Sequence, residues 1–408
     1  MKRRFTTIFA PLAVLLLPAA ADAGGPLTLQ DTGAPFAWST ATAIPYRTDN
    51  GPLSTSVNEA AARARVLAMF NVWQNVTTSN ISYTRAGFIN DIGVFTDGDV
   101  STGNEFNAVE GDCGGGFQSP IVYDANAAIF QDLGIDETSV IGFAGPCAID
   151  PGAGQFVSGE SVMNGLFQDG QVAPVPDLTA AEFDAAFVHE FGHFSGLDHS
   201  QINVNCASAP CSADDIAGLP TMFPFLVDAS QGVLSIDDIA WMSRLHPAPG
   251  AGGFAATHGT VTGTVYFSDG ESHAQLVNVV ARLVDNPGTP GVNESRTTAG
   301  SNVSGYKFRF FAGNPINDPT GQPFGSQAPG DIGLYEIPLP PGNYTIEVES
   351  IDPAFVEGSS VGGPRRIPMP GTAPAPSGPI AVAAGATASG NDVTLIGTDP
   401  RFDQFEGP

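Results

Sequence analysis

The sequence predicts an α+β domain with a mixed sheet, long helices and a cleft, followed by an all-β sandwich domain. Before residue 247, short stretches rich in β-branched and aromatic residues precede a capped helical segment. Proline and glycine dominate residues 247–253, which is typical of a boundary between domains. Beyond this run, only short alternating strands and turns follow, as in an all-β module. The length of 408 residues fits two domains of about 100–200 residues each.

The first residues have the pattern of a signal peptide. Lys2, Arg3 and Arg4 supply a basic start, residues 8–20 are apolar, and Ala21-Asp22-Ala23 is a small-x-small cleavage site. No later stretch reaches the ~18 consecutive apolar residues that a spanning helix needs. We therefore expect a secreted or periplasmic protein without membrane insertion. The predicted organisation is a signal peptide at 1–23, a first domain at 24–247, a linker at 248–256, a β-sandwich domain at 257–398 and a tail at 399–408.

Local signals place several elements of the first domain. Apolar stretches predict strands at 41–46, 81–83, 92–95 and 140–143. Thr179-Ala180-Ala181-Glu182 is a capping box, and Leu178 and Phe183 stand at the positions of a hydrophobic staple. A long helix should therefore run from about residue 180 to residue 195.

The predicted helix carries the pattern H-E-x-x-H-x-x-G-x-x-H, from His189 to His199. His189 and His193 are four residues apart, so both imidazoles project from one helix face toward a common point. Gly196 can adopt the left-handed conformation that ends the helix and brings His199 back to that point. Three histidine ligands leave a fourth position open, which is typical of a catalytic zinc site.

Glu190 follows the first predicted ligand, where its carboxylate can reach a water molecule at the open position. This placement predicts a general base and proton shuttle. A bare H-E-x-x-H also occurs by chance in unrelated helices. The additional Gly196 and His199 make chance improbable, because the chain has only six histidines and three stand at the ligand positions.

The extended motif resembles the metzincin clan of zinc endopeptidases, and Gly196–Ser200 is similar to its matrixin branch. Leu219–Pro224 is similar to the family's Met-turn, which implies that Met222 forms an apolar floor beneath the zinc ligands; an ordinary core methionine is the alternative. The resemblance extends to a strand at 43–46 and a helix ending at 70–73, with Ser56–Glu59 as its cap, and to a closing helix beginning at 234–239.

The sequence also departs from the matrixin pattern. No histidine precedes His189, so a second, structural zinc held by histidines is not expected. No cysteine-bearing propeptide lies between the leader and Trp38, and Pro224 stands where two other metzincin branches carry a tyrosine. We therefore expect a single zinc ion and no tyrosine ligand.

Four cysteines, an even number in an exported chain, suggest two disulfides. Three pairings are possible, and loop closure favours Cys206 with Cys211 and Cys113 with Cys147. Free thiols would be unusual in an oxidising compartment.

The composition is strongly acidic, with a formal net charge of −27. Such a surface repels nucleic acid and anionic membranes. Clustered carboxylates can also bind hard cations, so Ca²⁺ is possible at Asp91–Asp99 and at Asp124-Ala125-Asn126, although acidic loops are usually only solvated.

The second domain resembles the carboxypeptidase regulatory-like β-sandwich. The segments that carry this resemblance are 263–266, 277–283, 333–346 and 393–395. Other seven-stranded sandwiches have similar patterns. The resemblance implies a non-catalytic accessory module, whose ligand the sequence does not reveal.

Together these resemblances imply a secreted zinc-dependent endopeptidase that acts on a protein or peptide substrate. One alternative is a surface-binding or adhesive protein with an inactive metzincin fold, but the intact Glu190 argues against it. Another is a narrow processing protease with a single protein target.

Overall fold

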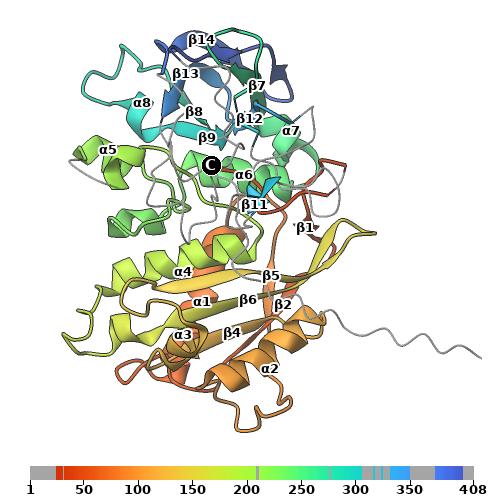
Figure 1. Cartoon of the computed structure of the whole chain (residues 1–408), viewed down its shortest axis with the longest axis vertical. Helices are drawn as coiled ribbons and strands as arrows, with labels where there is room; N and C mark the ends of the chain where they lie inside the picture. The colour runs from red at the N-terminus through yellow and green to blue at the C-terminus, as the bar shows by residue number, and fades with distance from the viewer. Residues whose placement is uncertain are drawn as a thin grey trace, which may run out of the picture.

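The computed structural model describes residues 24–30, 32–207, 211–274, 277–305, 316–317, 323–324, 331–349 and 373–397. The predicted signal peptide and the predicted tail lie outside these residues. The described part is a mixed α/β structure with several sheets (Figure 1).

A six-stranded mixed sheet organises the first half of the chain. Its order is β1-β6-β4-β2-β3, all parallel, and β5 pairs antiparallel with β6. The strands are β1 Ala37–Trp38, β2 Ile44–Thr48, β3 Tyr83–Phe88, β4 Pro120–Asp124, β5 Gly142–Asp150 and β6 Gln155–Asn164. The predicted strand at 92–95 is not formed, because Ile92 and Phe95 pair only with each other in an isolated bridge.

Helices pack against both faces of this sheet (Figure 1). They are α1 Glu59–Gln74, α2 Gly103–Gly114, α3 Ala128–Leu133 and α4 Ala180–Phe194, with the 3-10 turn η1 Gly165–Gln168. Phe70 of α1 stacks on Phe191 of α4 with ring centroids 3.8 Å apart. Trp73 Nε1 donates to the Val188 carbonyl at 2.8 Å, so α1 fixes the position of α4.

The ends of the long helices lie close to the sequence signals. The N-cap of α1 falls within the predicted segment Ser56–Glu59, but it is Asn58 and not Ser56, and its side chain accepts from the Ala61 amide. Thr179 and Glu182 form the predicted reciprocal capping box of α4, so this helix begins and ends close to the predicted residues.

Shorter elements connect α4 to the second half of the chain. They are η2 Val204–Ala207, α5 Ala213–Ala217, η3 Ala229–Gly232, α6 Ile236–Leu245, η4 Gly250–Gly252 and α7 Phe254–Thr257. The last two occupy the predicted linker, which is therefore folded and not extended.

The second half contains two four-stranded sheets. One has the order β12-β7-β15 with β16 also on β7, and the other has the order β14-β13-β8-β9. The elements are β7 Gly259–Tyr266, β8 Asn278–Leu283, α8 Glu294–Thr297, β9 Ala299–Val303, β10 Ile316–Asn317, β11 Pro323–Phe324, β12 Leu334–Leu339, β13 Gly342–Glu349, β14 Ser377–Val382, β15 Thr387–Ala388 and β16 Val393–Thr394. Strands of both sheets contribute to one apolar core.

These sheets lie directly on α6 (Figure 1). Arg244 of α6 forms an ion pair with Glu336 of β12 at 2.9 Å. Asp237 accepts from the Ser301 amide at 3.0 Å, and Trp241 Nε1 donates to the Ser301 carbonyl at 3.4 Å. The two halves of the chain are therefore joined by two buried hydrogen bonds of Ser301 and by one half-buried ion pair.

Both predicted disulfides are present, Cys113–Cys147 and Cys206–Cys211. They are compatible with an extracellular location. Among the described residues, no helix combines the length and the apolar character that crossing a membrane requires.

Candidate metal centre

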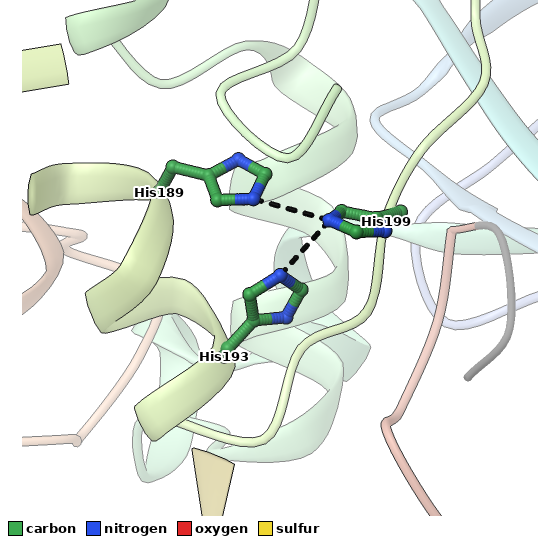
Figure 2. Close-up of side chains that lie close together, drawn as sticks. All are labelled: His189, His193 and His199. Atoms are coloured by element: carbon green, nitrogen blue, oxygen red, sulfur yellow. Dashed lines mark hydrogen bonds between the residues drawn. The ribbon is translucent and has the colours of Figure 1, made fainter. Parts of the chain in front are cut away.

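The three motif histidines converge on one point (Figure 2). His189 and His193 project from α4, and His199 comes from the segment that follows the helix. The Nε2 atom of His199 lies 3.1 Å from Nε2 of His189 and 3.0 Å from Nε2 of His193.

Backbone carbonyls set the orientation of two of the rings. Nδ1 of His189 lies 2.8 Å from the Thr221 carbonyl, and Nδ1 of His193 lies 2.9 Å from the Leu197 carbonyl. Because a carbonyl oxygen can only accept, each Nδ1 carries the hydrogen and each Nε2 offers its lone pair to the common point.

Burial keeps these imidazoles neutral. It lowers the pKa of His189 to about 4, that of His193 to about 3, and that of His199 well below its usual range. Neutral imidazole is the form that binds a metal ion.

The arrangement fits a tetrahedral metal ion. Three nitrogens at about 2.1 Å from one zinc would lie about 3.4 Å from one another, and the two Nε2 distances to His199, 3.1 and 3.0 Å, are slightly shorter. Nε2 of His189 and Nε2 of His193 both face Nε2 of His199. These histidines could therefore hold a metal ion.

The turn after α4 brings His199 into place. Gly196 has φ +92°, and a Cβ there would lie 2.5 Å from the ring of Phe156, so both conformation and space require glycine. Residues 24–27 run antiparallel to this segment: the Leu27 amide donates to the Gly196 carbonyl at 2.8 Å, and the Asp198 amide donates to the Gly25 carbonyl at 3.0 Å.

Met222 packs against α4 at Gly192. It is 2 % exposed, and a Cβ on Gly192, between the two helical ligands, would come within 2.2 Å of its Sδ. Asp238 of α6 holds this turn by accepting from the Thr221 amide at 2.9 Å and the Met222 amide at 3.1 Å. The Met222 carbonyl in turn accepts from the Ser200 amide at 2.8 Å, next to His199.

Glu190 is buried beside the histidines but outside their cluster. Burial raises the pKa of its carboxyl to about 8. A Cβ on Gly142, the first residue of β5, would lie 3.0 Å from Glu190 Cγ. The Glu190 side chain therefore lies next to the start of β5.

The calcium expectation finds no support in the described residues. The buried Asp124 carboxylate accepts from the Phe130 amide at 3.0 Å and so serves the start of α3. Asp91–Asp99 is not among the groups of three or more potential metal ligands found in the described part of the chain.

Some residues of the site carry no signal in the sequence. The carbonyls of Thr221 and Leu197 orient two ligands, but any residue type supplies a carbonyl. His246 is also buried. Its Nε2 lies 2.9 Å from the carbonyl of Ser195, the C-cap residue of α4, so this histidine contacts the end of the helix and not the other three histidines.

Comparison with known proteins adds no further information on this site. No model of a protein family matches the chain, and no curated protein matches it.

Proposed function

We propose that the protein is a secreted, zinc-dependent endopeptidase of the metzincin type. The observation that carries this proposal is the convergence of three neutral imidazole nitrogens beside a buried glutamate that is not itself a ligand. A purely structural zinc site has four protein ligands and no need for a base. Zinc bound by His189, His193 and His199 would supply Lewis-acid polarisation of a carbonyl and activation of a water molecule.

Glu190 performs the proton transfers in this proposal. Its carboxylate accepts the proton of the attacking water and then delivers it to the leaving amide nitrogen. Its raised pKa suits the delivery of the proton to the leaving nitrogen, since a carboxyl group with a pKa near neutrality can both accept and donate a proton. A metal cation nearby would lower the pKa of Glu190, which favours the ionised carboxylate that accepts the proton.

The edge strand β5 offers a place for the substrate backbone. Among the described strands, β5 pairs only with β6, and its first residue lies against Glu190. An extended peptide can add to such an edge by main-chain hydrogen bonds. A peptide bound there would present a peptide bond to the base and the metal site.

The test is peptide hydrolysis by the protein beginning at Gly24, with bound zinc quantified. A mixed peptide library should be cleaved, and Glu190→Gln should lower the rate by about 10²–10⁴-fold while zinc remains bound. Glu190→Gln is the matched control because it keeps the size of the side chain and removes the base. Stoichiometric zinc without cleavage of peptides or proteins would contradict the endopeptidase proposal and favour a binding role.

A further inference from the structure

The segment that follows His199 is fixed by the β-sandwich. Asn278 Nδ2 of β8 donates to the Gln201 carbonyl at 3.0 Å, and Ser200 Oγ and Ser301 Oγ of β9 are hydrogen-bonded at 3.1 Å. Ile202 is buried in a small apolar cluster whose other members, Val280 and Ala299, belong to the sandwich. Each residue from Ser200 to Ile202 therefore contacts the second half of the chain.

Arg282 of β8 is the charged centre of this interface. It is 1 % exposed, although a buried cation is costly unless it is paired and hydrogen-bonded. Its Nε donates to Glu347 at 3.0 Å, and its Nη2 forms an ion pair with Glu349, both on β13. Nη2 also donates to Asn203 Oδ1 at 2.9 Å, so the guanidinium reaches out of its sheet into the ligand segment.

Asn203 has a left-handed backbone conformation and a fully hydrogen-bonded side chain. It is fully buried and has φ +58°, a left-handed conformation that is uncommon outside glycine. Its Nδ2 donates to the Asp215 carbonyl at 2.9 Å and to the Arg296 carbonyl at 3.3 Å. With Arg282 on its oxygen, every polar atom of the side chain is used, which fixes the path of the chain four residues after His199.

We propose that Arg282, acting through Asn203, is a positioning residue for the third zinc ligand. The β-sandwich is then a part of the metal centre and not a separate accessory module. The proposal rests on the proposed zinc site, but not on peptidase activity, because it concerns how firmly His199 is held. Loosening one of three ligands should weaken metal binding and distort its geometry.

The experiment measures zinc affinity by chelator competition in the full-length mature protein. Arg282→Lys keeps a positive charge but loses the fork that contacts both the carboxylates and Asn203. Asn203→Gly keeps the left-handed backbone and removes the side chain. We expect each variant to bind zinc about 10–100-fold more weakly, as is typical for loss of a group that orients a ligand. We also expect an altered absorption spectrum of the cobalt(II)-substituted protein.

Two control variants separate positioning from general stability. Arg244→Gln removes another ion pair to the sandwich, with Glu336, but one that starts from α6. Ala127→Gly alters the other described non-glycine residue with positive φ, at 58°, which lies before α3. Both controls should retain the zinc affinity and the cobalt spectrum of the unmodified protein.

Unchanged zinc affinity and an unchanged cobalt spectrum in a folded Asn203→Gly variant would overturn the proposal. If Arg282→Lys does not fold, Asn203→Gly alone is the deciding test. The outcome is independent of activity: weaker zinc binding in a protein that cleaves no peptide would support the positioning role and refute only the peptidase proposal.

Discussion

At the scale of single residues, the helical motif depends on a glycine between its two histidines. Gly192 faces Met222 and Trp73, and a Cβ there would lie 2.2 Å from Met222 Sδ and 2.9 Å from Trp73 Cζ2. The absence of a side chain lets Met222 approach α4 between His189 and His193. Gly192 occupies an x position of H-E-x-x-H, and its contacts with Met222 and Trp73 restrict this position to glycine.

The first prediction is that Gly192→Ala destabilises the protein by about 1–3 kcal/mol, because the added methyl group overpacks this contact. Gly111→Ala is a matched control, since Gly111 also lies within a helix and a Cβ there would meet nothing within 4 Å. It should be neutral or stabilising by up to ~1 kcal/mol. Chemical denaturation of both variants measures the difference, and equal effects would refute the packing argument.

The second prediction concerns Glu160 of β6. Burial and the nearby Glu110 carboxylate raise the pKa of Glu160 to about 8. The folded protein therefore binds this proton more tightly than the unfolded chain does. The resulting stabilisation is complete below the unfolded pKa of ~4.3 and is lost as the pH rises toward 8.

Glu160→Gln removes that titration, so the variant should gain stability relative to the unmodified protein as the pH rises from 5 to 8, by at most a few kcal/mol. Thermal unfolding across this pH range measures the gain. Glu271→Gln, at an exposed position of the β-sandwich, is the control for replacing a carboxylate by an amide. A constant offset for Glu160→Gln would rule out the titration.

At the scale of elements, α6 and the Met222 turn form one unit through Asp238. Its carboxylate is 1 % exposed and accepts three amides, those of Thr221, Met222 and Ser235. The same turn presents the Thr221 carbonyl to His189. The start of α6 therefore helps to determine how the first histidine is oriented.

The third prediction is that Asp238→Asn lowers the free energy of unfolding by about 1–3 kcal/mol and weakens zinc binding, because the amide group of asparagine turns a donor toward backbone N–H groups. Isothermal denaturation and chelator competition measure the two effects. Asp228→Asn is the control, since Asp228 is itself exposed and caps the short turn η3. Unchanged zinc affinity in Asp238→Asn would show that the Met222 turn does not influence metal binding.

Local signals account for what the sequence predicts well. The capping box at Thr179 and the helical spacing of His189 and His193 depend only on neighbouring residues, so the bounds of α4 and its ligand face could be read directly. Strand β6 was not predicted, because Gln155–Asn164 mixes glycine, serine and glutamate, and its place is set by pairing with β1, β4 and β5. The contact between Asn203 and Arg282 joins residues 79 positions apart, and no local pattern indicates it.

At the scale of the whole molecule, the two halves share their polar interior. Ser301 of β9 bonds with Asp237 and Trp241 of α6, and Arg244 pairs with Glu336. The separate domains predicted from composition are thus joined by contacts that neither half satisfies alone. A buried polar group that loses its partner is costly, so the halves stabilise each other.

The fourth prediction is that the full-length mature protein unfolds in one cooperative transition, because the interface couples the two halves. Calorimetry should give one peak, and removal of zinc by a chelator should lower the temperature of that whole peak. Arg244→Gln should lower it further without splitting it. Two separate peaks, with only the first sensitive to chelator, would show that the halves fold independently.

The folded linker fixes the half that carries the three histidines relative to the β-sandwich. A flexible tether lets an anchored enzyme sample a volume around its anchor, at an effective concentration set by tether length. Here η4 and α7 replace such a tether, and the β-sandwich is bonded to the segment that carries His199. A partner bound to the described sheets of the second half would therefore be held at a nearly fixed distance from the three histidines.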